Sequence, residues 1–226
     1  MTGGSADGST GGRDTAGAGG ETGGRDTARA ARRPTIRHPT GRRHDPGRRD
    51  RIIDAAISVI AEHGVAGTTH RLIAAAVDVP LGSLTYHFTS LDELRALAFR
   101  RHAERMSAVY AAHFDRVGTR AELVEAVTDL VHGDASADAR DWAVAYELYL
   151  AALRDPALRG ITESWMRTSR AVLERFVDPA TARGVDGLIE GLVMHKLLAT
   201  TPVSRAETRE YVRRLLGEPA DPGPGV

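Results

Sequence analysis

The sequence predicts an all-α fold, and three observations carry that prediction. From Arg48 onward, apolar side chains recur at spacings of three and four residues, the repeat of a helix with one buried face. Glycine, proline and Asp-Pro pairs punctuate these segments where helices would end. No segment shows the sustained alternation of apolar and polar residues that predicts a strand.

The first three helices are predicted to form a helix-turn-helix. The first begins at Arg48 and stops at Gly64, and the second follows an N-cap at Thr68 or Thr69. Asp78 tolerates the backbone of a tight turn, and Pro80 suits the first turn of a third helix that extends to residue 88.

A longer fourth helix is expected to start at the sequence SLDE, residues 90–93. Here Ser90 and Glu93 have the spacing of a reciprocal capping box. This helix ends before Gly118 and is long enough to join two domains. Further helices are predicted at residues 119–132, 137–154, 156–176, 182–200 and 204–216.

The predicted domains follow from composition. Residues 1–47 hold twelve of the 24 glycines and repeat GGRDTA at 11–16 and 23–28, so we expect a disordered Gly/Arg-rich tail. Residues 48–99 form the helix-turn-helix domain, residues 100–217 a helical effector-binding and dimerisation domain, and residues 218–226 a flexible tail.

Charge is unevenly distributed although the formal net charge is zero. Residues 1–50 hold ten arginines and six acids, whereas residues 51–99 hold three arginines and five acids. The segment with the helix-turn-helix pattern is therefore acidic, and the basic excess lies in the preceding tail.

Several functional classes lack their signatures. The chain has no cysteine, its nine histidines show no metal-ligand spacing, and LGSLT around Ser83 lacks the second glycine of a nucleophile elbow. We therefore expect that the protein is not an enzyme and that it binds no metal and no cofactor. Without a long apolar run or a leader segment, a cytoplasmic protein that spans no membrane is expected.

The run from Arg51 to Leu94 resembles the DNA-binding domain of the TetR family of transcriptional regulators. The resemblance rests on IIDAAISVIAEHG, TTHRLIAAAVDV, LGSLTYHF and TSLDEL, in this order and at this spacing. It implies an all-helical homodimer that binds double-stranded operator DNA through a helix-turn-helix and a small-molecule effector through its C-terminal domain. Repression, relieved by the effector, is the default mode.

The resemblance also implies which side chains contact DNA. Base-reading positions fall on Arg71, Leu81, Gly82 and Ser83, and the phosphate contacts on Thr69, Tyr86 and His87, with His70 and Thr85 as additions. Arginine can read guanine with two hydrogen bonds, while small residues let a helix approach base edges. The sequence departs from the family pattern at Asp78, Thr85 and Leu91, and the last removes a phosphate contact.

An arginine arm is a hypothesis drawn from charge. Arg42, Arg43, Arg48 and Arg49 precede the acidic domain and could reach phosphates or the adjacent minor groove. A tail that only solubilises the protein is the alternative, and the sequence leaves both open.

Aromatic and polar residues in the C-terminal domain suggest an effector pocket, although an aromatic stripe can also be plain core. The candidates are Met106, Tyr110, Phe114, Trp142, Tyr146, Tyr149, Trp165, Met166 and His195. Among polar residues, Glu147 and His195 are the first expected inside the pocket.

Small residues in VDGLIEGLVMHKLL predict a close helix-helix contact between two copies. The candidates for this dimer interface are Gly187, Leu188, Gly191, Leu192 and Tyr211. The same residues could instead close the core of one subunit.

A helical protein-interaction module without sequence-specific DNA binding remains the alternative function.

Overall fold

A computed structural model describes residues 45–133 and 137–217 of the chain. These residues form nine α-helices and one short 3-10 helix, and no strand occurs among them. The predicted all-α class is confirmed. The proposed tails at 1–47 and 218–226 lie almost entirely outside the described residues.

The helix-turn-helix forms as predicted, from helices α1 (Arg48–Gly67), α2 (His70–Ala76) and α3 (Leu81–His87). Gly64 has φ 67° and kinks α1 at the predicted stop, so that only a short turn continues to Gly67. Asp78 has φ 51°, a left-handed conformation that aspartate adopts more readily than most residues. Pro80 is the N-cap of α3 and does not lie in its first turn.

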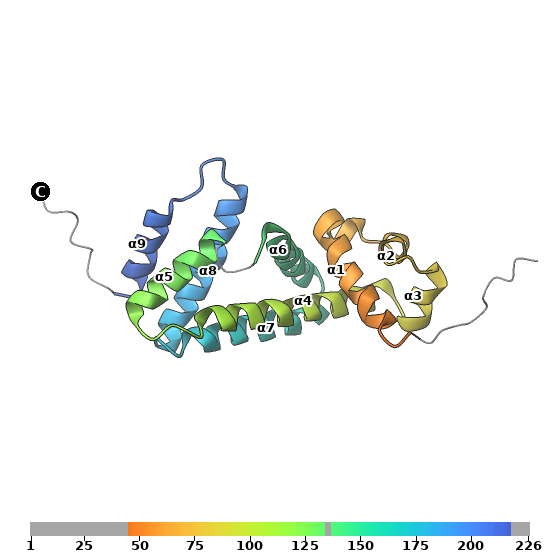
Figure 1. The fold of residues 1–226 in the computed structure, drawn as a ribbon, viewed down its shortest axis with the longest axis horizontal. Helices are drawn as coiled ribbons and strands as arrows, with labels where there is room; N and C mark the ends of the chain where they lie inside the picture. Colours follow the sequence, from red (N-terminus) through yellow and green to blue (C-terminus); the bar gives the residue numbers. More distant parts are fainter. Residues whose placement is uncertain (1–44, 134–136, 218–226) are drawn as a thin grey trace, which may run out of the picture. The chain divides into compact units, whose positions relative to one another are not determined.

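The long helix is α4 (Leu91–Phe114), which runs beside α7 (Figure 1). Ser90 caps it by accepting a hydrogen bond from the backbone N–H of Glu93 at 3.0 Å. The reciprocal half of the predicted capping box is wrong, because the Glu93 carboxylate accepts from the backbone N–H of Thr89 at 2.7 Å.

The remaining helices are α5 (Arg120–His132), α6 (Ala139–Arg154), α7 (Arg159–Leu173), α8 (Pro179–Leu198) and α9 (Arg205–Leu215). Two predicted starts are corrected. Residues Pro156–Leu158 form a 3-10 turn before α7, and α8 begins at Pro179 because the Asp178 side chain caps the N–H groups of Ala180 and Thr181.

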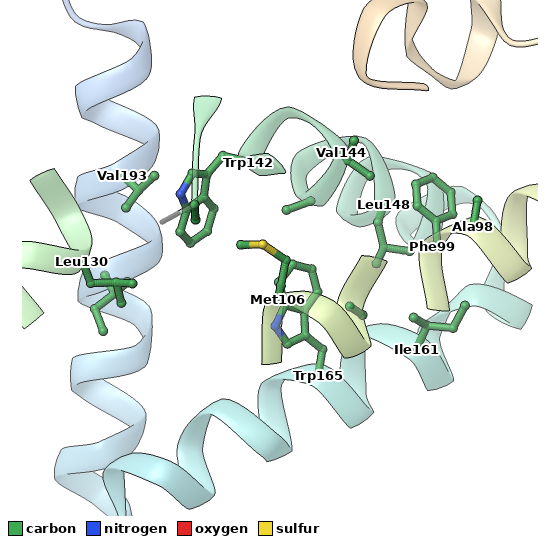
Figure 2. Packing of buried hydrophobic residues seen from close by; sticks show 14 of the residues in the cluster. Ala98, Phe99, Met106, Leu130, Trp142, Val144, Leu148, Ile161, Trp165 and Val193 are labelled. Carbon is green, nitrogen blue, oxygen red and sulfur yellow. The ribbon is translucent and has the colours of Figure 1, made fainter. Parts of the chain in front are cut away.

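Buried apolar side chains fill the core between α4, α6 and α7. Phe99 and Leu148 have no exposed surface, and Ile161 packs beside them at 8% exposure (Figure 2). Helix α6 also contacts α1, so it lies against both the helix-turn-helix and the C-terminal core. The helices α5, α8 and α9 contact one another.

Candidate nucleic-acid interface and interior cavity

Helix α3 presents an open face of small and hydroxyl-bearing residues. Leu81 is 52% exposed and Tyr86 is 77% exposed, while Gly82 and Thr85 are also exposed. A Cβ placed on Gly82 would meet no atom within 4 Å. Such a thin surface can approach base edges in the major groove.

The opposite face of α3 anchors the helix in the core. Leu84 and Phe88 are 0% and 3% exposed, and their spacing of four residues places both on one side of the helix. Ser83 and His87 lie at the border and are half-buried. The orientation of α3 is therefore fixed by two apolar side chains, which leaves its polar face outward.

The start of α2 adds polar groups. The Thr69 hydroxyl oxygen accepts from the backbone N–H of Leu72 at 3.3 Å, which leaves its own O–H able to donate to a phosphate. His70 is half-buried and Arg71 is exposed. Within residues 45–133 and 137–217, Arg71 forms no ion pair, so its guanidinium can bind a base or a phosphate.

The arginines before the helix-turn-helix differ from one another. The Arg49 guanidinium lies over the ring of Phe88, 5.3 Å from its centroid, and is thus beside the C-terminal end of α3. Arg48 instead faces Asp45, with Nε 3.9 Å from the carboxylate. Arg42 and Arg43 lie outside the described residues, so the arm stays a prediction.

Three side chains connect the helix-turn-helix to the rest of the protein. Arg95 of α4 donates hydrogen bonds at 2.9 Å to the backbone carbonyls of Val65 and Thr68. Arg101, also on α4, pairs with Asp50 and Asp54 of α1. These contacts hold α1 and the start of α2 against α4.

Glu147 of α6 makes the third connection. Its carboxylate accepts a hydrogen bond from the backbone N–H of Val65 at 2.9 Å and lies 3.0 Å from the position of a Cβ on Gly64. The expectation that Glu147 faces the effector pocket is therefore wrong. Glu147 lies on the side of α6 that faces α1, so its helical position directs it away from the cavity.

An interior cavity of about 20 Å³ lies between α4, α6, α7 and α8. In Figure 2 the side chain of Met106 extends between the indole rings of Trp142 and Trp165. Most of the residues around the cavity are apolar, and Tyr110, Ser169, Asp186 and Glu190 bring polar oxygens. The full lining is Met106, Val109, Tyr110, Leu130, Ala137, Trp142, Trp165, Ser169, Asp186, Ile189 and Glu190. The volume suffices for about one water molecule, whereas sites for drug-sized ligands occupy roughly 300–1,000 Å³.

Two carboxylates of α8 border this cavity. Burial raises the pKa of Asp186 to about 6, with Arg170 acting against that shift from 3.7 Å. Burial also raises the pKa of Glu190 to about 7, against the hydrogen bond from Tyr149, and neighbouring Asp186 raises it further. The Tyr149 hydroxyl donates to Glu190 at 2.6 Å.

The structure gathers part of the predicted pocket. Met106, Tyr110, Trp142 and Trp165 line the cavity, and Tyr146 and Tyr149 reach it through Glu190. Phe114 is buried core beside Tyr110, Met166 does not line the cavity, and His195 is exposed on α8. Sequence reasoning missed Asp186 and Glu190, although two acids within the largely apolar segment VDGLIEGLV were a usable signal.

The predicted interface residues also separate into two groups. Gly187 and Tyr211 are exposed, and Gly191 and Leu188 are half-buried. Leu192 is 8% exposed and belongs to the core of the subunit, so it cannot contribute much to a surface. Exposed Met194 and Leu198 continue the open side of α8 instead.

Together, the fold and the open α3 face define a helix-turn-helix protein. Residues 52–97 match the sequence model described as bacterial regulatory proteins, tetR family, and residues 118–218 match the one described as tetracyclin repressor-like, C-terminal domain. A TetR family member from Streptomyces coelicolor A3 is 41% identical, with a TM-score of 0.63 and coverage of 75% of this chain and 98% of that one. The chain belongs to the TetR family, whose members are DNA-binding transcriptional regulators.

Two other relatives are similar over different lengths. The multidrug binding protein EbrR, in a complex with imidazole, is 40% identical over 79% of this chain and 99% of that chain, with a TM-score of 0.63. The transcriptional repressor AcnR of Corynebacterium diphtheriae is 31% identical over 57% of this chain. That match spans only 63% of AcnR.

Proposed function

We propose that the protein is a repressor that binds a palindromic operator as a homodimer and is released by a small, partly apolar effector. The observation that carries this proposal is the open α3 face, on which Leu81, Gly82 and Tyr86 are exposed and uncovered. A dimer on a promoter blocks polymerase, and an effector that prefers another spacing of the two reading helices releases it. The site of action is the cytoplasm, where the operator lies.

Sequence reading is assigned to Arg71, Leu81, Gly82 and Ser83. Arg71 can form two hydrogen bonds with guanine, and Leu81 offers an apolar contact to a thymine methyl group. The donors Thr69, His70, Tyr86 and His87 surround these residues and would hold the phosphates. The Thr85 hydroxyl donates to the backbone carbonyl of Gly82 at 3.2 Å and would have to exchange this bond for a phosphate contact. Arg49 supplies a cation beside α3, which has no lysine or arginine of its own.

The dimer interface is assigned to the open side of α8 and to Tyr211 of α9. A Cβ on Gly187 or Gly191 would meet nothing within 4 Å in the single subunit. Small residues flanked by exposed Met194 and Leu198 allow a second helix to approach closely. The palindromic operator requires this pairing, because two reading helices must reach successive major grooves.

The effector site is assigned to the interior cavity. EbrR has been solved in complexes with proflavin, ethidium and malachite green as well as imidazole. The cavity of this chain is too small for such molecules in the described conformation, so the effector must bind a more open one. Its opening would move α4 and α6, which both contact α1.

Selection of bound DNA from a random pool tests the proposal. The full-length protein is expected to enrich a palindrome whose half-sites are about one helical turn apart. Arg71→Ala should relax the preference at one symmetric base pair while binding to unrelated DNA persists. If the wild-type protein enriches no sequence at low salt, the open α3 face serves protein contacts, and the repressor proposal fails.

A further inference from the structure

We propose that Arg95 of α4 is a positioning residue for sequence reading, because it holds the start of α2 at the place from which Arg71 reaches a guanine. This inference rests on the proposed operator binding. It adds a side chain that acts through the backbone to those that contact the bases. It predicts that discrimination at one base pair depends on a residue of the long helix α4.

The Arg95 guanidinium is engaged through both of its terminal nitrogens. Nη2 donates hydrogen bonds at 2.9 Å to the backbone carbonyls of Val65 and Thr68, and Nη1 donates to the Asp92 carboxylate at 3.0 Å. The side chain of Arg95 is 21% exposed. A planar guanidinium has its donors in a rigid fork and holds acceptors in a defined geometry. Arg95 therefore fixes two backbone positions with one nitrogen.

The two carbonyls lie where α1 passes into α2. Val65 follows the kink at Gly64, and Thr68 directly precedes Thr69, the N-cap of α2. The last carbonyls of a helix lack partners within it and favour a nearby cation, yet α1 has no basic residue in its last turn. Arg95 supplies this cation from another helix. One side chain thus holds both the end of α1 and the start of α2.

Thr68 transmits this hold to the reading residue. It is 1% exposed, and its hydroxyl donates to the backbone carbonyl of Gly64 at 2.7 Å. Its own carbonyl accepts from Arg95 and lies three residues before Arg71 in the chain. A displacement of the Thr68 peptide would therefore move the first turn of α2, which carries Arg71.

Helix α2 is short and is buried through its second half. It has seven residues, of which Ile73 and Ala74 are buried. A helix of this length is marginal on its own, and the capping bond from the Leu72 N–H to Thr69 is long at 3.3 Å. Two hydrogen bonds to one guanine require that Arg71 be held within roughly 0.5 Å of its productive place. Arg95 provides this precision at the end of α2 that its buried residues do not reach.

Arg101, one and a half turns further along α4, offers a matched comparison. It donates to the backbone carbonyl of Asp50 at 2.9 Å and pairs with the carboxylates of Asp50 and Asp54. Both arginines join α4 to the helix-turn-helix, but Arg101 binds the first half of α1, far along the chain from α2. Loss of either side chain should lower stability, whereas loss of Arg95 should also alter the base preference.

The test measures discrimination at the base pair whose preference Arg71→Ala relaxes. Full-length variants are titrated with labelled operator DNA and with the three versions substituted at that pair. Arg95→Met keeps an apolar stem and removes the donors, and we expect discrimination at this pair to fall at least about fivefold. Binding to unrelated DNA, which depends on phosphate contacts, should change less than about twofold. The ratio of two affinities measured on one preparation does not depend on the folded fraction.

Three further variants separate positioning from general stability. If Arg95 acts through Arg71, the double variant with Arg71→Ala and Arg95→Met should discriminate at this pair as Arg71→Ala does. Arg101→Met should leave discrimination within about twofold of wild type, whatever its stability. Arg95→Lys retains a donor but lacks the fork, and should lose at least about threefold in discrimination. It takes the place of Arg95→Met if that variant does not fold.

The positioning role is overturned by full discrimination in Arg95→Met, or in Arg95→Lys where that variant replaces it. An equal loss in Arg101→Met, or a double variant that discriminates less than Arg71→Ala, also overturns it, as does an operator at which Arg71→Ala relaxes no preference. In each of these cases the wild-type protein still selects its operator, so the repressor proposal stands. A wild-type protein that selects no sequence refutes the repressor proposal, and the positioning role falls with it.

Discussion

The carboxylate of Glu147 accepts a hydrogen bond from the backbone N–H of Val65 at 2.9 Å, joining α6 to the kinked end of α1. The adjacent residue Tyr146 donates through its hydroxyl to the backbone carbonyl of Glu190 at 3.3 Å, on the cavity side of α6. One helix therefore contacts both the cavity and the DNA-reading domain. A displacement of α6 by an effector would act directly on α1.

Removal of the Glu147 carboxylate should lower the free energy of unfolding and reduce the effect of the effector on operator affinity. In Glu147→Ala the Val65 N–H loses its charged acceptor, and we expect a decrease of about 1–2 kcal/mol in the free energy of unfolding. The ratio of operator affinities with and without effector should also fall. Glu147→Gln retains an acceptor oxygen and serves as the control; equal behaviour of Glu147→Ala and wild type in both measurements would rule out the coupling role.

Stability should fall as pH rises, owing to the buried acids. Burial raises the pKa of Glu190 from 4.5 to about 7, and that of Asp186 from 3.8 to about 6. At pH values between the ordinary pKa of each acid in the unfolded chain and its raised pKa in the folded chain, the folded chain binds more protons. The free energy of unfolding therefore decreases as pH rises through this range. The decrease from Glu190 alone amounts to about 3 kcal/mol by pH 8.

Urea denaturation at pH 5 and pH 8 measures this effect, with Glu190→Gln as the comparison. Tyr149, Tyr146, Tyr110 and Asp186 interact with the Glu190 carboxylate, and Arg170 lies 3.7 Å from Asp186. The variant should be more stable than wild type at pH 8 and should lose less stability between the two pH values. A pH dependence identical to that of wild type would show that Glu190 keeps an ordinary pKa.

The arm hypothesis predicts a change in salt dependence. Asp45 accepts a hydrogen bond from the backbone N–H of Gly47 and pairs with Arg51, so a deletion should end at residue 44 to preserve the start of α1. If Arg42 and Arg43 bind phosphates, the slope of log K against log salt should become shallower by about 0.9 for each phosphate that the shortened protein no longer neutralises. An unchanged slope would leave the tail without a role in affinity.

If α8 forms the dimer interface, replacing its glycines by alanine should stabilise the folded subunit but weaken its association with a second copy. Gly187→Ala with Gly191→Ala should favour the helix by roughly 1 kcal/mol per site if α8 faces water, because alanine is the better helix former. In a close helix pair, the added methyl groups instead force the subunits apart. We expect analytical ultracentrifugation to show weaker dimerisation. Gly160→Ala, at an exposed position of α7, is the control, and an unchanged dimer would exclude this face.

Sequence patterns predicted most helix ends because caps are local. Ser90, Thr119 and Ser204 each accept a hydrogen bond from a backbone N–H three residues further on, so their positions can be read from a few neighbouring residues. The start of α8 is predicted at residue 182 but lies at Pro179, because Asp178 as N-cap and Pro179 in the first turn together begin a helix. The outward face of α3 also follows from neighbouring residues, because Leu84 and Phe88 determine which side of the helix is buried.

The cavity could not be predicted in the same way, because its side chains come from distant parts of the chain. Tyr149 and Glu190 are separated by 41 positions, and Glu147 and Val65 by 82. Helical spacing showed that Tyr146 and Tyr149 share a face but not which helix that face meets. Glu147 and His195 were therefore expected inside the cavity, whereas Glu190 occupies that place.

Substitution of Gly82 by glutamate tests the central claim that α3 enters a DNA groove. The side chain would extend into open space, since a Cβ there meets no atom within 4 Å, so the fold should keep its thermal stability. On the DNA its bulk and charge would hold α3 away from the bases, and operator affinity should fall at least about tenfold, or about 1.4 kcal/mol. Gly160→Glu, at another open glycine, should bind as wild type does. A folded Gly82→Glu variant with unchanged operator affinity would contradict the account.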